Sequence, residues 1–575
     1  MKKSVLFSAA AGLAMLISIT GCSKKNKLLL SDGAFTGTGS GRNGPIQVLL
    51  TVTDGEISDA KITKEEESQD VGHAIEDKLL EQFLKSNGDI KKIDVISGAT
   101  ITSNGVKEAL SSALDKSTGK TKSKEQYSNS ETDIVIIGAG GAGLTAATEA
   151  AGRGAKVIVL EKNGFPGGNT NSSTGGLNAS ETSVQKALGI QDSNSQFLED
   201  TLISGHYKND KALAKKMVES SAEIVDWLQG ETVGADLSDV GLMGGCTNKR
   251  THRPNGGQAI GPHLIPKLYE AAKKAGAEIR LSNTVTDIIS ENGEPVGVWV
   301  QNENGSYNIK AKAIIIATGG FGANPQLIGK YRPDLQNYPT TNIRSAQGDA
   351  FAWVEKFDAE LVLMNEIQTH PSVAVGGGTL ITEAVRGNGA IMLDHKGRRF
   401  LNELETRDFV SEKILSLPEK TAFIFFNEEV RKSLKAVEEY VETGLLTEAA
   451  TVEEMAQKLK MNPDILKETL DTYNTSKSSG KDELFNRPDL PVSFETGPYY
   501  AVEVEPAIHN TMGGLKINTD AQVINKSGKP IPRLYAAGEV TGGVHGDNRI
   551  GGNAVAEICI FGRIAAKSAC ESIGY

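Results

Sequence analysis

Three glycines near residue 140 stand where a protein chain can bind a dinucleotide. Gly138, Gly140 and Gly143 follow the apolar run 133–137 and open a stretch with helical spacing of apolar residues. Such glycines permit a tight turn and a close backbone approach to a pyrophosphate, which sits on the N-terminus of the following helix. Glu161 ends the next apolar run, about twenty residues on, where an acid can bond ribose hydroxyls. The spacing therefore predicts a β-α-β nucleotide-binding unit.

The gross composition bounds the kinds of molecule that this chain can be. It has 575 residues, more than one hydrophobic core accommodates, so several domains are expected. A net charge of −11 argues against nucleic acid as a partner. Cys246, Cys559 and Cys570 show neither metal-ligand spacing nor a disulfide framework, so we expect no metal site.

The N-terminus has the character of an export signal. Lys2 and Lys3 precede a mostly apolar stretch from Val5 to Ile19, and the segment ends with Gly21-Cys22. It resembles the signal peptide of a bacterial lipoprotein over residues 1–22, in which Cys22 is acylated. The resemblance implies a protein anchored by lipid to the outer side of a bacterial cell membrane.

Composition changes along the chain divide it into segments. Residues 31–116 contain the alternating strand pattern Ile46–Thr53 followed by the turn pair Asp54-Gly55, and two stretches with helical spacing. Residues 117–131 are rich in Lys, Ser and Thr and read as a flexible linker. From residue 131 the pattern alternates between buried strands and helices, which is typical of an α/β domain with a parallel sheet.

The N-terminal segment resembles an FMN-binding domain from end to end. Its segment Asp94–Thr100 is similar to the site at which the phosphate of FMN is esterified to a threonine. The resemblance implies covalent FMN on Thr100, with Thr102 as the next candidate, and a separate FMN transferase for its attachment.

The remainder of the chain resembles the flavoprotein family of fumarate reductases and succinate dehydrogenases, and most closely the soluble flavocytochrome c-type fumarate reductases. The motifs are Gly167–Thr170, Ala317–Gly320, Ala537–Thr541 and the segments around His370, Thr382, Arg407, His509 and Arg549. The resemblance implies FAD bound without a covalent link, because Asn169 follows Gly168 where a linking histidine would stand. The implied FAD-binding residues are Gly138, Gly140, Gly143, Glu161, Lys162, Gly168, Asn169, Thr170, Gly175, Gly176, Thr318, Gly319, Gly320, Glu539, Asn553, Ala554 and Val555.

The same resemblance assigns roles in the reduction of an unsaturated dicarboxylate by hydride transfer from N5 of FAD. Arg549 and His509 would bind one carboxylate, and His370 and Thr382 the other, with Glu383 also at the substrate. Arg407 would donate the proton, supplied through Glu383 and Arg386. Chemistry alone would favour His370 or Glu383 as the acid, because the free pKa of arginine is ~12.5 or higher.

Two positions depart from the family pattern. Asn510 stands where relatives often have a second histidine, and Asp547 replaces a small residue just before Asn548-Arg549. A carboxylate at residue 547 would repel a dianionic substrate unless it points away. The joint presence of His370, Thr382 and Glu383 nevertheless favours a small dicarboxylate over urocanate, acrylate or a cinnamate. A surface flavin protein that carries electrons without turnover of its own is the alternative from another class.

We therefore expect a Rossmann-like α/β FAD domain over 131–365 and 509–575, with an inserted α+β capping domain over 366–508 and a small α+β FMN-binding domain over 31–116. The expected function is extracytoplasmic reduction of fumarate to succinate. A membrane or extracellular donor would reduce FMN on Thr100, and the electrons would pass to FAD.

Overall fold

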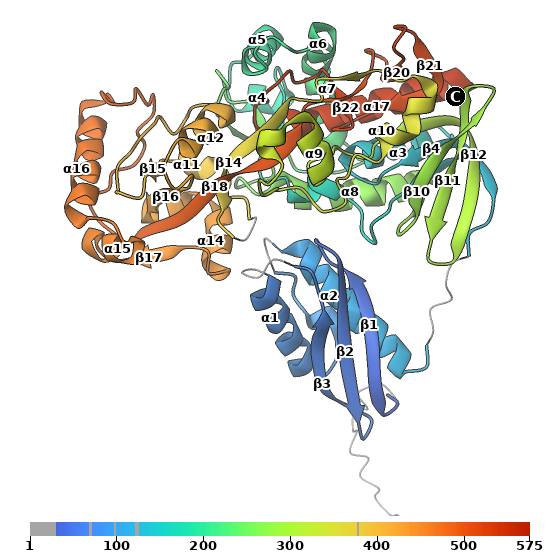
Figure 1. Cartoon of the computed structure of the whole chain (residues 1–575), viewed down its shortest axis with the longest axis horizontal. Helices are drawn as coiled ribbons and strands as arrows, with labels where there is room; N and C mark the ends of the chain where they lie inside the picture. The colour runs from blue at the N-terminus through green and yellow to red at the C-terminus, as the bar shows by residue number, and fades with distance from the viewer. Residues whose placement is uncertain (1–29, 68–71, 97–98, 121–125, 377–378) are drawn as a thin grey trace, which may run out of the picture.

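The computed structural model describes residues 30–67, 72–96, 99–120, 126–376 and 379–575. These residues form three bodies, each with its own buried apolar cluster (Figure 1). We call them the N-terminal unit (residues 30–120), the nucleotide-binding unit (126–365 and 509–575) and the cap (366–508). Cys22 and the predicted export signal lie outside the described residues, as do Ser97 and Gly98 next to Thr100.

The N-terminal unit is an antiparallel sheet covered by two helices. Strands β1 (Gly33–Ser40), β2 (Pro45–Thr53) and β3 (Glu56–Lys64) pair in that order, and helices α1 (Gly72–Lys85) and α2 (Thr100–Ser117) pack against them. The alternation in β2 points Ile46, Val48 and Leu50 inward, each fully buried. Thr100 is thereby the first residue of a helix held against the sheet.

A mostly parallel sheet forms the centre of the nucleotide-binding unit. Its order is β10 (Thr284–Glu291), β11 (Glu294–Asn302), β12 (Gly305–Ile316), β4 (Ser130–Ile137), β5 (Val157–Leu160) and β9 (Glu278–Arg280), and β21 (Pro530–Ala536) also pairs with β12. Helices α3 (Gly141–Gly152), α8 (Ile260–Ala275) and α17 (Asn553–Ile573) pack beside it (Figure 1). Residues 134–137 are fully or almost fully buried in the apolar cluster that this sheet shares with α3 and α17.

The turn between β4 and α3 depends on glycine. Gly138 has a φ of +104°, which L side chains rarely adopt. A Cβ atom on Gly143 would lie 1.9 Å from the carbonyl oxygen of Gly138. The helix can therefore start this close to the strand only because residue 143 has no side chain.

The cap is built on a second antiparallel sheet. Its strands β14 (Ile367–Ala374), β18 (Tyr499–Thr511), β16 (Ala422–Asn427) and β15 (Ile391–Leu393) pair in that order, and β17 (Thr447–Ala449) joins β18. Its helices are α11 (Ala384–Gly387), α12 (Arg407–Leu415), α13 (Glu428–Ser433), α14 (Lys435–Glu442), α15 (Val452–Leu459) and α16 (Pro463–Ser479). The long pair β14–β18 runs from the nucleotide-binding unit into the cap (Figure 1).

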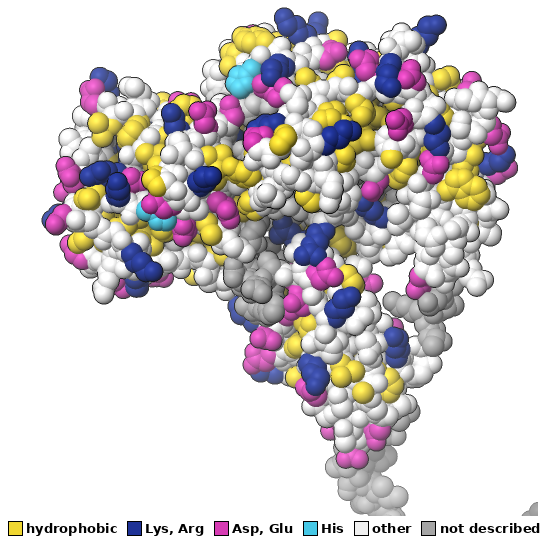
Figure 2. Space-filling model, viewed as in Figure 1, with side chains coloured by type: hydrophobic (Ala, Val, Ile, Leu, Met, Phe, Trp, Pro, Cys, Tyr) yellow, Lys and Arg dark blue, Asp and Glu magenta, His cyan; other side chains and the backbone are white. Residues whose placement is uncertain are grey.

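The N-terminal unit lies against both other bodies through a few polar contacts. Glu66 forms an ion pair with Arg344 of the nucleotide-binding unit. Lys78 Nζ donates a hydrogen bond to the carbonyl oxygen of Glu442 in the cap, at 3.3 Å. On the face drawn in Figure 2, acidic and basic side chains are interspersed over all three bodies. No helix among the described residues is long and apolar enough to cross a lipid bilayer.

The contact at Gly143 leads to a prediction about stability. Gly143→Ala should lower the stability of the nucleotide-binding unit by ~3 kcal/mol, because backbone atoms would have to move apart. Gly152→Ala in the same helix is the matched control, since no atom lies within 4 Å of the added Cβ. The control should be neutral or stabilise by about 0.5–1 kcal/mol. Thermal unfolding and the amount of dinucleotide retained after gel filtration measure both effects, and equal behaviour of the two variants would contradict the steric argument.

Candidate active site

The glycine turn lies at the mouth of a pocket that suits a dinucleotide. The pocket lies beyond the C-terminal ends of β4, β5 and β12, where open α/β sheets bind their ligands. Gly319 has a φ of +75° with open space beside it, and the buried hydroxyl of Thr318 has no hydrogen-bond partner. Ten predicted residues line the pocket: Gly138, Gly140, Glu161, Lys162, Gly168, Asn169, Thr170, Thr318, Gly319 and Glu539. Unused polar groups and space next to a helix N-terminus fit a pyrophosphate.

Glu161 organises this pocket from below. Its carboxylate accepts hydrogen bonds from the backbone nitrogens of Ala139 and Asn163, at 2.9 and 2.8 Å. Burial raises the pKa of Glu161, and these hydrogen bonds oppose that rise. Lys162 Nζ lies 2.5 Å from Asp349 Oδ2. The acid therefore fixes the glycine turn in addition to facing the predicted ribose position.

Other predicted residues lie around this pocket. Gly143, Gly175, Gly176 and Gly320 allow close packing of the backbone nearby, whereas Ala554 and Val555 line a second, larger cavity. Asn553 begins α17 and accepts a hydrogen bond from Asn178 at 2.7 Å.

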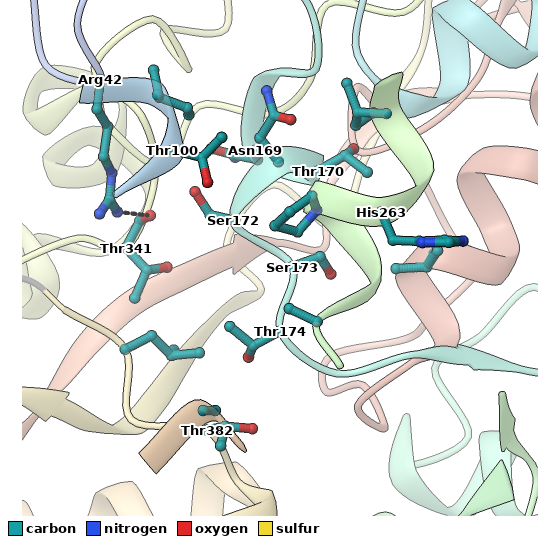
Figure 3. A pocket seen from close by; sticks show the side chains of 18 of the residues that line it. Arg42, Thr100, Asn169, Thr170, Ser172, Ser173, Thr174, His263, Thr341 and Thr382 are labelled. Carbon is teal, nitrogen blue, oxygen red and sulfur yellow. Dashed lines mark hydrogen bonds between the residues drawn. The ribbon is translucent and has the colours of Figure 1, made fainter. Parts of the chain in front are cut away.

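The second cavity measures ≈ 1290 Å³ and opens between all three bodies. Its wall runs from Thr100 of the N-terminal unit, past Asn169 and Thr170, to Thr382 of the cap (Figure 3). His509 and Arg549 belong to the same wall. Its size and continuity allow aromatic cofactors and a small substrate to meet within one enclosure.

The two threonines at the start of α2 have different surroundings. Thr100 is half-buried and its side chain lies on the cavity wall facing Asn169 and Ser172 (Figure 3). Thr102 is buried, and its hydroxyl donates a hydrogen bond to Glu67 at 2.5 Å. Both threonines line the cavity, but the hydroxyl of Thr102 is already bound to Glu67.

Glu539 joins the two cavities. It accepts hydrogen bonds from the backbone nitrogen of Thr511 at 2.9 Å and from Asn169 at 3.5 Å. Burial raises its pKa. A carboxyl held in this way between the two cavities suits the hydroxyls of a ribityl chain.

Arg407 and Arg386 flank the carboxylate of Glu383 inside the protein. Arg407 Nε and Nη2 lie 3.0 and 2.9 Å from Glu383 Oε2, and Arg386 Nη2 lies 3.6 Å from Oε1. Burial would raise the pKa of Glu383, but the charges of Arg407 and Arg386 outweigh it and lower that pKa. Arg407 Nη1 also donates to Gln368 Oε1 at 3.3 Å. The predicted proton path is thus one connected cluster.

Arg549 supplies a further buried cation on the cavity wall. Its Nε has no hydrogen-bond partner, and burial, reinforced by the charge of Arg407, lowers its pKa to about 9. His545 lies on the same wall with an unpartnered Nδ1. The sequence motifs assigned no role to His545. Its position four residues before Arg549 is the signal that could have identified it. These unpaired donors make the wall suited to an anion.

His370 and His509 meet edge to face, with ring centroids 5.0 Å apart. His509 Nδ1 lies 2.8 Å from Thr341 Oγ1. Burial first, and the nearby guanidinium groups second, lower the pKa of both imidazoles well below the usual value. Both rings are therefore neutral near pH 7 and can act as hydrogen-bond donors without adding charge.

The predicted substrate residues are brought together, but not all of them reach the cavity. Thr382, His509 and Arg549 line it, whereas the cluster of His370, Glu383, Arg386 and Arg407 lies directly behind them. The backbone nitrogen of Thr382 donates to the hydroxyl of Tyr440 at 3.0 Å. Gln368, Thr341 and Tyr440 thus position the set, and no motif singled them out.

The two departures from the family pattern are placed differently. Asp547 turns outward, with Oδ1 2.7 Å from His206 Nδ1 and Oδ2 3.0 Å from Lys208 Nζ. It does not line the cavity, so its charge is balanced on the outer side. Asn510 does line the cavity, and its amide donates to the carbonyl oxygen of Thr511 at 3.2 Å.

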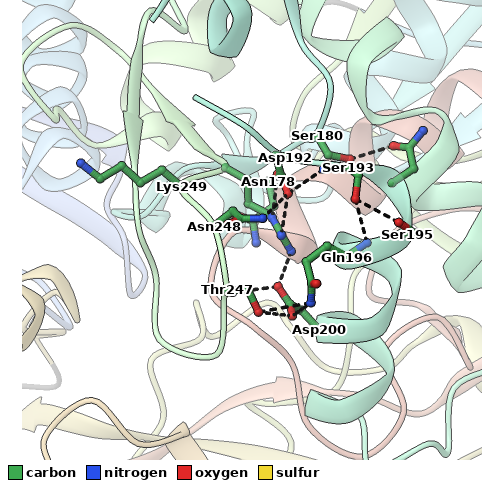
Figure 4. Close-up of polar contacts among 12 residues, drawn as sticks. Asn178, Ser180, Asp192, Ser193, Ser195, Gln196, Asp200, Thr247, Asn248 and Lys249 are labelled. Atoms are coloured by element: carbon green, nitrogen blue, oxygen red, sulfur yellow. Dashed lines mark hydrogen bonds and ion pairs between the residues drawn. The ribbon is translucent and has the colours of Figure 1, made fainter. Parts of the chain in front are cut away.

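A buried ionic network holds the segment next to Asn553. Arg250 is fully buried and binds Asp192 and Asp200 at 2.9 and 2.7 Å, within the polar network of Figure 4. Thr251 donates to Asn178 at 2.6 Å, and Asn178 in turn bonds Asn553. Within the described ranges, no three His, Cys, Asp or Glu side chains are grouped so as to hold a metal ion.

Family comparisons agree with this division of the chain. The FAD binding domain family matches residues 133–555, and the FMN-binding domain family matches residues 41–115. The resemblance to fumarate reductase flavoproteins and the mixed fold with an N-terminal FMN-binding domain are confirmed.

Individual relatives support the same assignment. The NADH:fumarate oxidoreductase of Klebsiella pneumoniae is 42% identical over 501 residues, which cover 86% of this chain and 54% of that longer protein. The urocanate reductase of Eggerthella lenta is 31% identical and covers 98% of this chain and 97% of its own length. The open conformation of a flavocytochrome c3 fumarate reductase superposes with a TM-score of 0.68 at 39% identity, over 79% of this chain and 83% of that one.

The environment of His545 gives a pH prediction. Burial, and then the charge of Arg549, lower the pKa of His545 well below its usual value. Below pH ~6.5 the unfolded chain therefore binds a proton that the folded chain does not, and stability falls as the pH falls. In His545→Asn this contribution should be absent. The slope of the unfolding free energy against pH should then differ from that of the wild type by up to ~1.4 kcal/mol per pH unit.

Denaturation of wild type and variant between about pH 7 and 5, followed by release of FAD, measures the difference. The comparison cancels the opposite contribution of Glu557, whose pKa burial raises to about 8. A difference between the two proteins that does not change with pH would contradict the prediction.

Proposed function

This chain belongs to the FAD binding domain family and also carries an FMN-binding domain, and from that premise we propose that it reduces fumarate to succinate outside the cytoplasm. The proposal rests mainly on the buried guanidinium groups of Arg549 and Arg407. Arg549 has an unpartnered Nε and lines the same cavity as the residues expected beside the flavin ring. Such a wall suits a small dianion, because arginine stays charged and can bind a carboxylate with two hydrogen bonds.

The substrate would lie between the two histidines and the two arginines. Arg549 and His509 bind one carboxylate, and Thr382 and His370 bind the other. Neutral His370 and His509 donate hydrogen bonds while the guanidinium groups supply the positive charge that stabilises charge developing on the carboxylate. FAD, when bound, supplies the pair of electrons that reduces the double bond.

Arg407 would deliver the proton to the second alkene carbon. Its Nε and Nη2 face Glu383, so the carboxylate orients the guanidinium and can return a proton to it. Arg386 lies near the other oxygen of Glu383 and extends the path to the buried segment at Glu403. Because the cluster lies behind the cavity wall, movement of the cap would bring Arg407 into reach of the substrate.

Electrons would enter through the N-terminal unit. We propose that FMN is esterified to Thr100 by a separate FMN transferase and is reduced by a membrane or extracellular donor. The support is the position of Thr100 on the cavity that also contains the predicted flavin ring site of FAD. The sequence around Cys22 supports a lipid anchor on the outer side of the bacterial cell membrane.

Another unsaturated acid is the second candidate, since one relative that matches nearly full length is a urocanate reductase. The test is an acceptor panel with the viologen-reduced, flavin-loaded protein and fumarate, urocanate, acrylate, crotonate and cinnamate. We expect fast turnover with fumarate. Arg407→Ala should lower that turnover by at least ~10³-fold with FAD retained, because it removes both the acid and a cation.

The control for that variant is Lys413→Ala on the same helix α12, which should keep full activity. If urocanate alone were reduced quickly, urocanate and not fumarate would be the substrate. If Arg407→Ala turned over as fast as the wild type, Arg407 would not be the proton donor.

Attachment of FMN gives an independent prediction. Thr100→Val should abolish the covalent FMN seen by intact-mass measurement after coexpression with an FMN transferase. Thr102→Val is the matched control, and it should keep the ester although it loses the hydrogen bond to Glu67. Both variants should retain FAD. If covalent FMN were lost only in Thr102→Val, Thr102 and not Thr100 would be the attachment site.

A further inference from the structure

The outward carboxylate of Asp547 contacts an imidazole and an ammonium group from one loop. His206 and Lys208 follow α5 (Asn194–Ser204), and they contact opposite oxygens of Asp547 at 2.7 and 3.0 Å. Asp547 stands two residues before Arg549, so any constraint on it acts on the segment that carries the substrate-binding guanidinium.

The same two side chains also reach the cap. His206 Nε2 lies 3.7 Å from Asp408 Oδ2, and Lys208 Nζ lies 2.8 Å from Glu366 Oε1. Asp408 directly follows Arg407 in the first turn of α12, and Glu366 directly precedes β14. One loop of the nucleotide-binding unit therefore touches its own substrate segment and two separate segments of the cap, at Asp408 and Glu366.

The loop of His206 and Lys208 has a fixed shape. His206 and Tyr207 have φ values of +48° and +57°, which non-glycine residues adopt only where their surroundings hold them. Asn209 donates its side-chain amide to the carbonyl oxygen of Val544 at 3.0 Å, and the backbone nitrogen of Asp210 donates to Gly543 at 2.7 Å. The loop and the segment 543–549 are thus tied together as one piece.

An inner set of amides connects this outer cluster to the two arginines. Asn548 donates to Asp408 at 2.7 Å and accepts from Gln368 at 2.5 Å. Gln368 also donates to the carbonyl oxygen of Arg549 at 2.9 Å and accepts from Arg407 at 3.3 Å. A shift of the cap relative to Asp547 would therefore change the distance between the two guanidinium groups.

We propose that His206, Lys208 and Asp547 form an electrostatic latch that holds the cap against the nucleotide-binding unit and thereby positions Arg407 and Arg549 for the substrate. The identity of the substrate in this proposal comes from the proposed function. The latch also explains why an acid at position 547 is compatible with a site for a dianion. The family position holds a small residue, which cannot bind these two side chains. In this chain the three carboxylates of Asp547, Asp408 and Glu366 share the imidazole of His206 and the ammonium group of Lys208, which belong to a single rigid loop.

The partial exposure of the latch determines its expected strength. The side chains of His206 and Lys208 are 53% and 47% exposed, so each contact is individually weak and is screened by salt. Loss of the latch lowers the fraction of molecules with the arginines in place, which raises KM by the same factor. Saturating substrate restores that arrangement, so kcat should change little.

The kinetic test uses Lys208→Met and Asp547→Asn in the flavin-loaded enzyme. We expect KM for fumarate to rise about threefold to tenfold, with kcat within about twofold of wild type. Lys208→Arg should restore the wild-type KM. Lys215→Met is the matched control, since Lys215 forms a comparable surface pair with Glu219 away from the cap. Raising salt from about 0.05 to 0.5 M should raise KM more in the wild type than in Asp547→Asn, because only the wild type also loses the contacts of Asp547.

Hydrogen exchange tests the latch without any assumption about the substrate. Amides of α12 should exchange faster in Asp547→Asn than in wild type, while those of α16, on the far side of the cap, stay unchanged. Unchanged exchange in α12, or an unchanged KM in both variants, would overturn the proposal. If the wild type fails to reduce fumarate, the proposed function falls, but the exchange experiment still decides the latch.

Discussion

The buried positive charge around Glu383 is the constraint on which the rest of the site depends. Arg407, Arg386 and Arg549 lie out of water, and Glu383 is the carboxylate that Arg407 and Arg386 share, while Glu539 and Glu557 lie near Arg549. Burying unpaired charge costs several kcal/mol per ion, so the cluster is stable only with further anions or hydrogen-bond acceptors. Burial first, and then the charge of the guanidinium groups, lowers the pKa of His370 and His509, because another cation here would be poorly solvated and repelled. In the proposed function, a bound dicarboxylate would add negative charge beside these arginines.

The strand pair β14–β18 keeps this charged cluster in one place although it belongs to two bodies. Gln368 of β14 pairs with Asn510 of β18, and His370 and His509 come from the same two strands. At the end of the pair, Ile367 and Ile508 are buried in a small apolar cluster with Phe321. The histidines are therefore fixed near the nucleotide-binding unit, whereas Thr382, Glu383 and Arg407 stand on loops and helix starts of the cap. A site split in this way can be assembled or opened by a small movement of the cap.

The sequence predicted those parts of the molecule that depend on local pattern. The glycine turn before α3 and the alternation in β2 follow from periodicity and from the backbone freedom of glycine. Motifs also indicated which arginines and histidines would gather. They did not indicate which of these residues reach the cavity, because the direction of a side chain on an irregular segment depends on contacts made elsewhere in the chain. Asp547 turns outward because His206 and Lys208, some 340 residues earlier, lie beside it. Gln368 and Thr341 were missed for the same reason.

The outward position of Asp547 also bears on which substrate the site accepts. If Asp547 and Arg549 both faced the cavity, the carboxylate would repel a dianionic ligand while the guanidinium group attracted it. At similar short distances these two effects nearly cancel, so binding would be weaker. Here the carboxylate turns away from the cavity and contacts the imidazole of His206 and the ammonium group of Lys208 on the solvent side. Its field at the cavity is therefore small, whereas the fields of Arg549 and Arg407 act in a buried region where charges are poorly screened. In the proposed arrangement, discrimination between a dicarboxylate and a monocarboxylate would fall to the inner set, and within that set to His370 and Thr382, which are assigned to the second carboxylate.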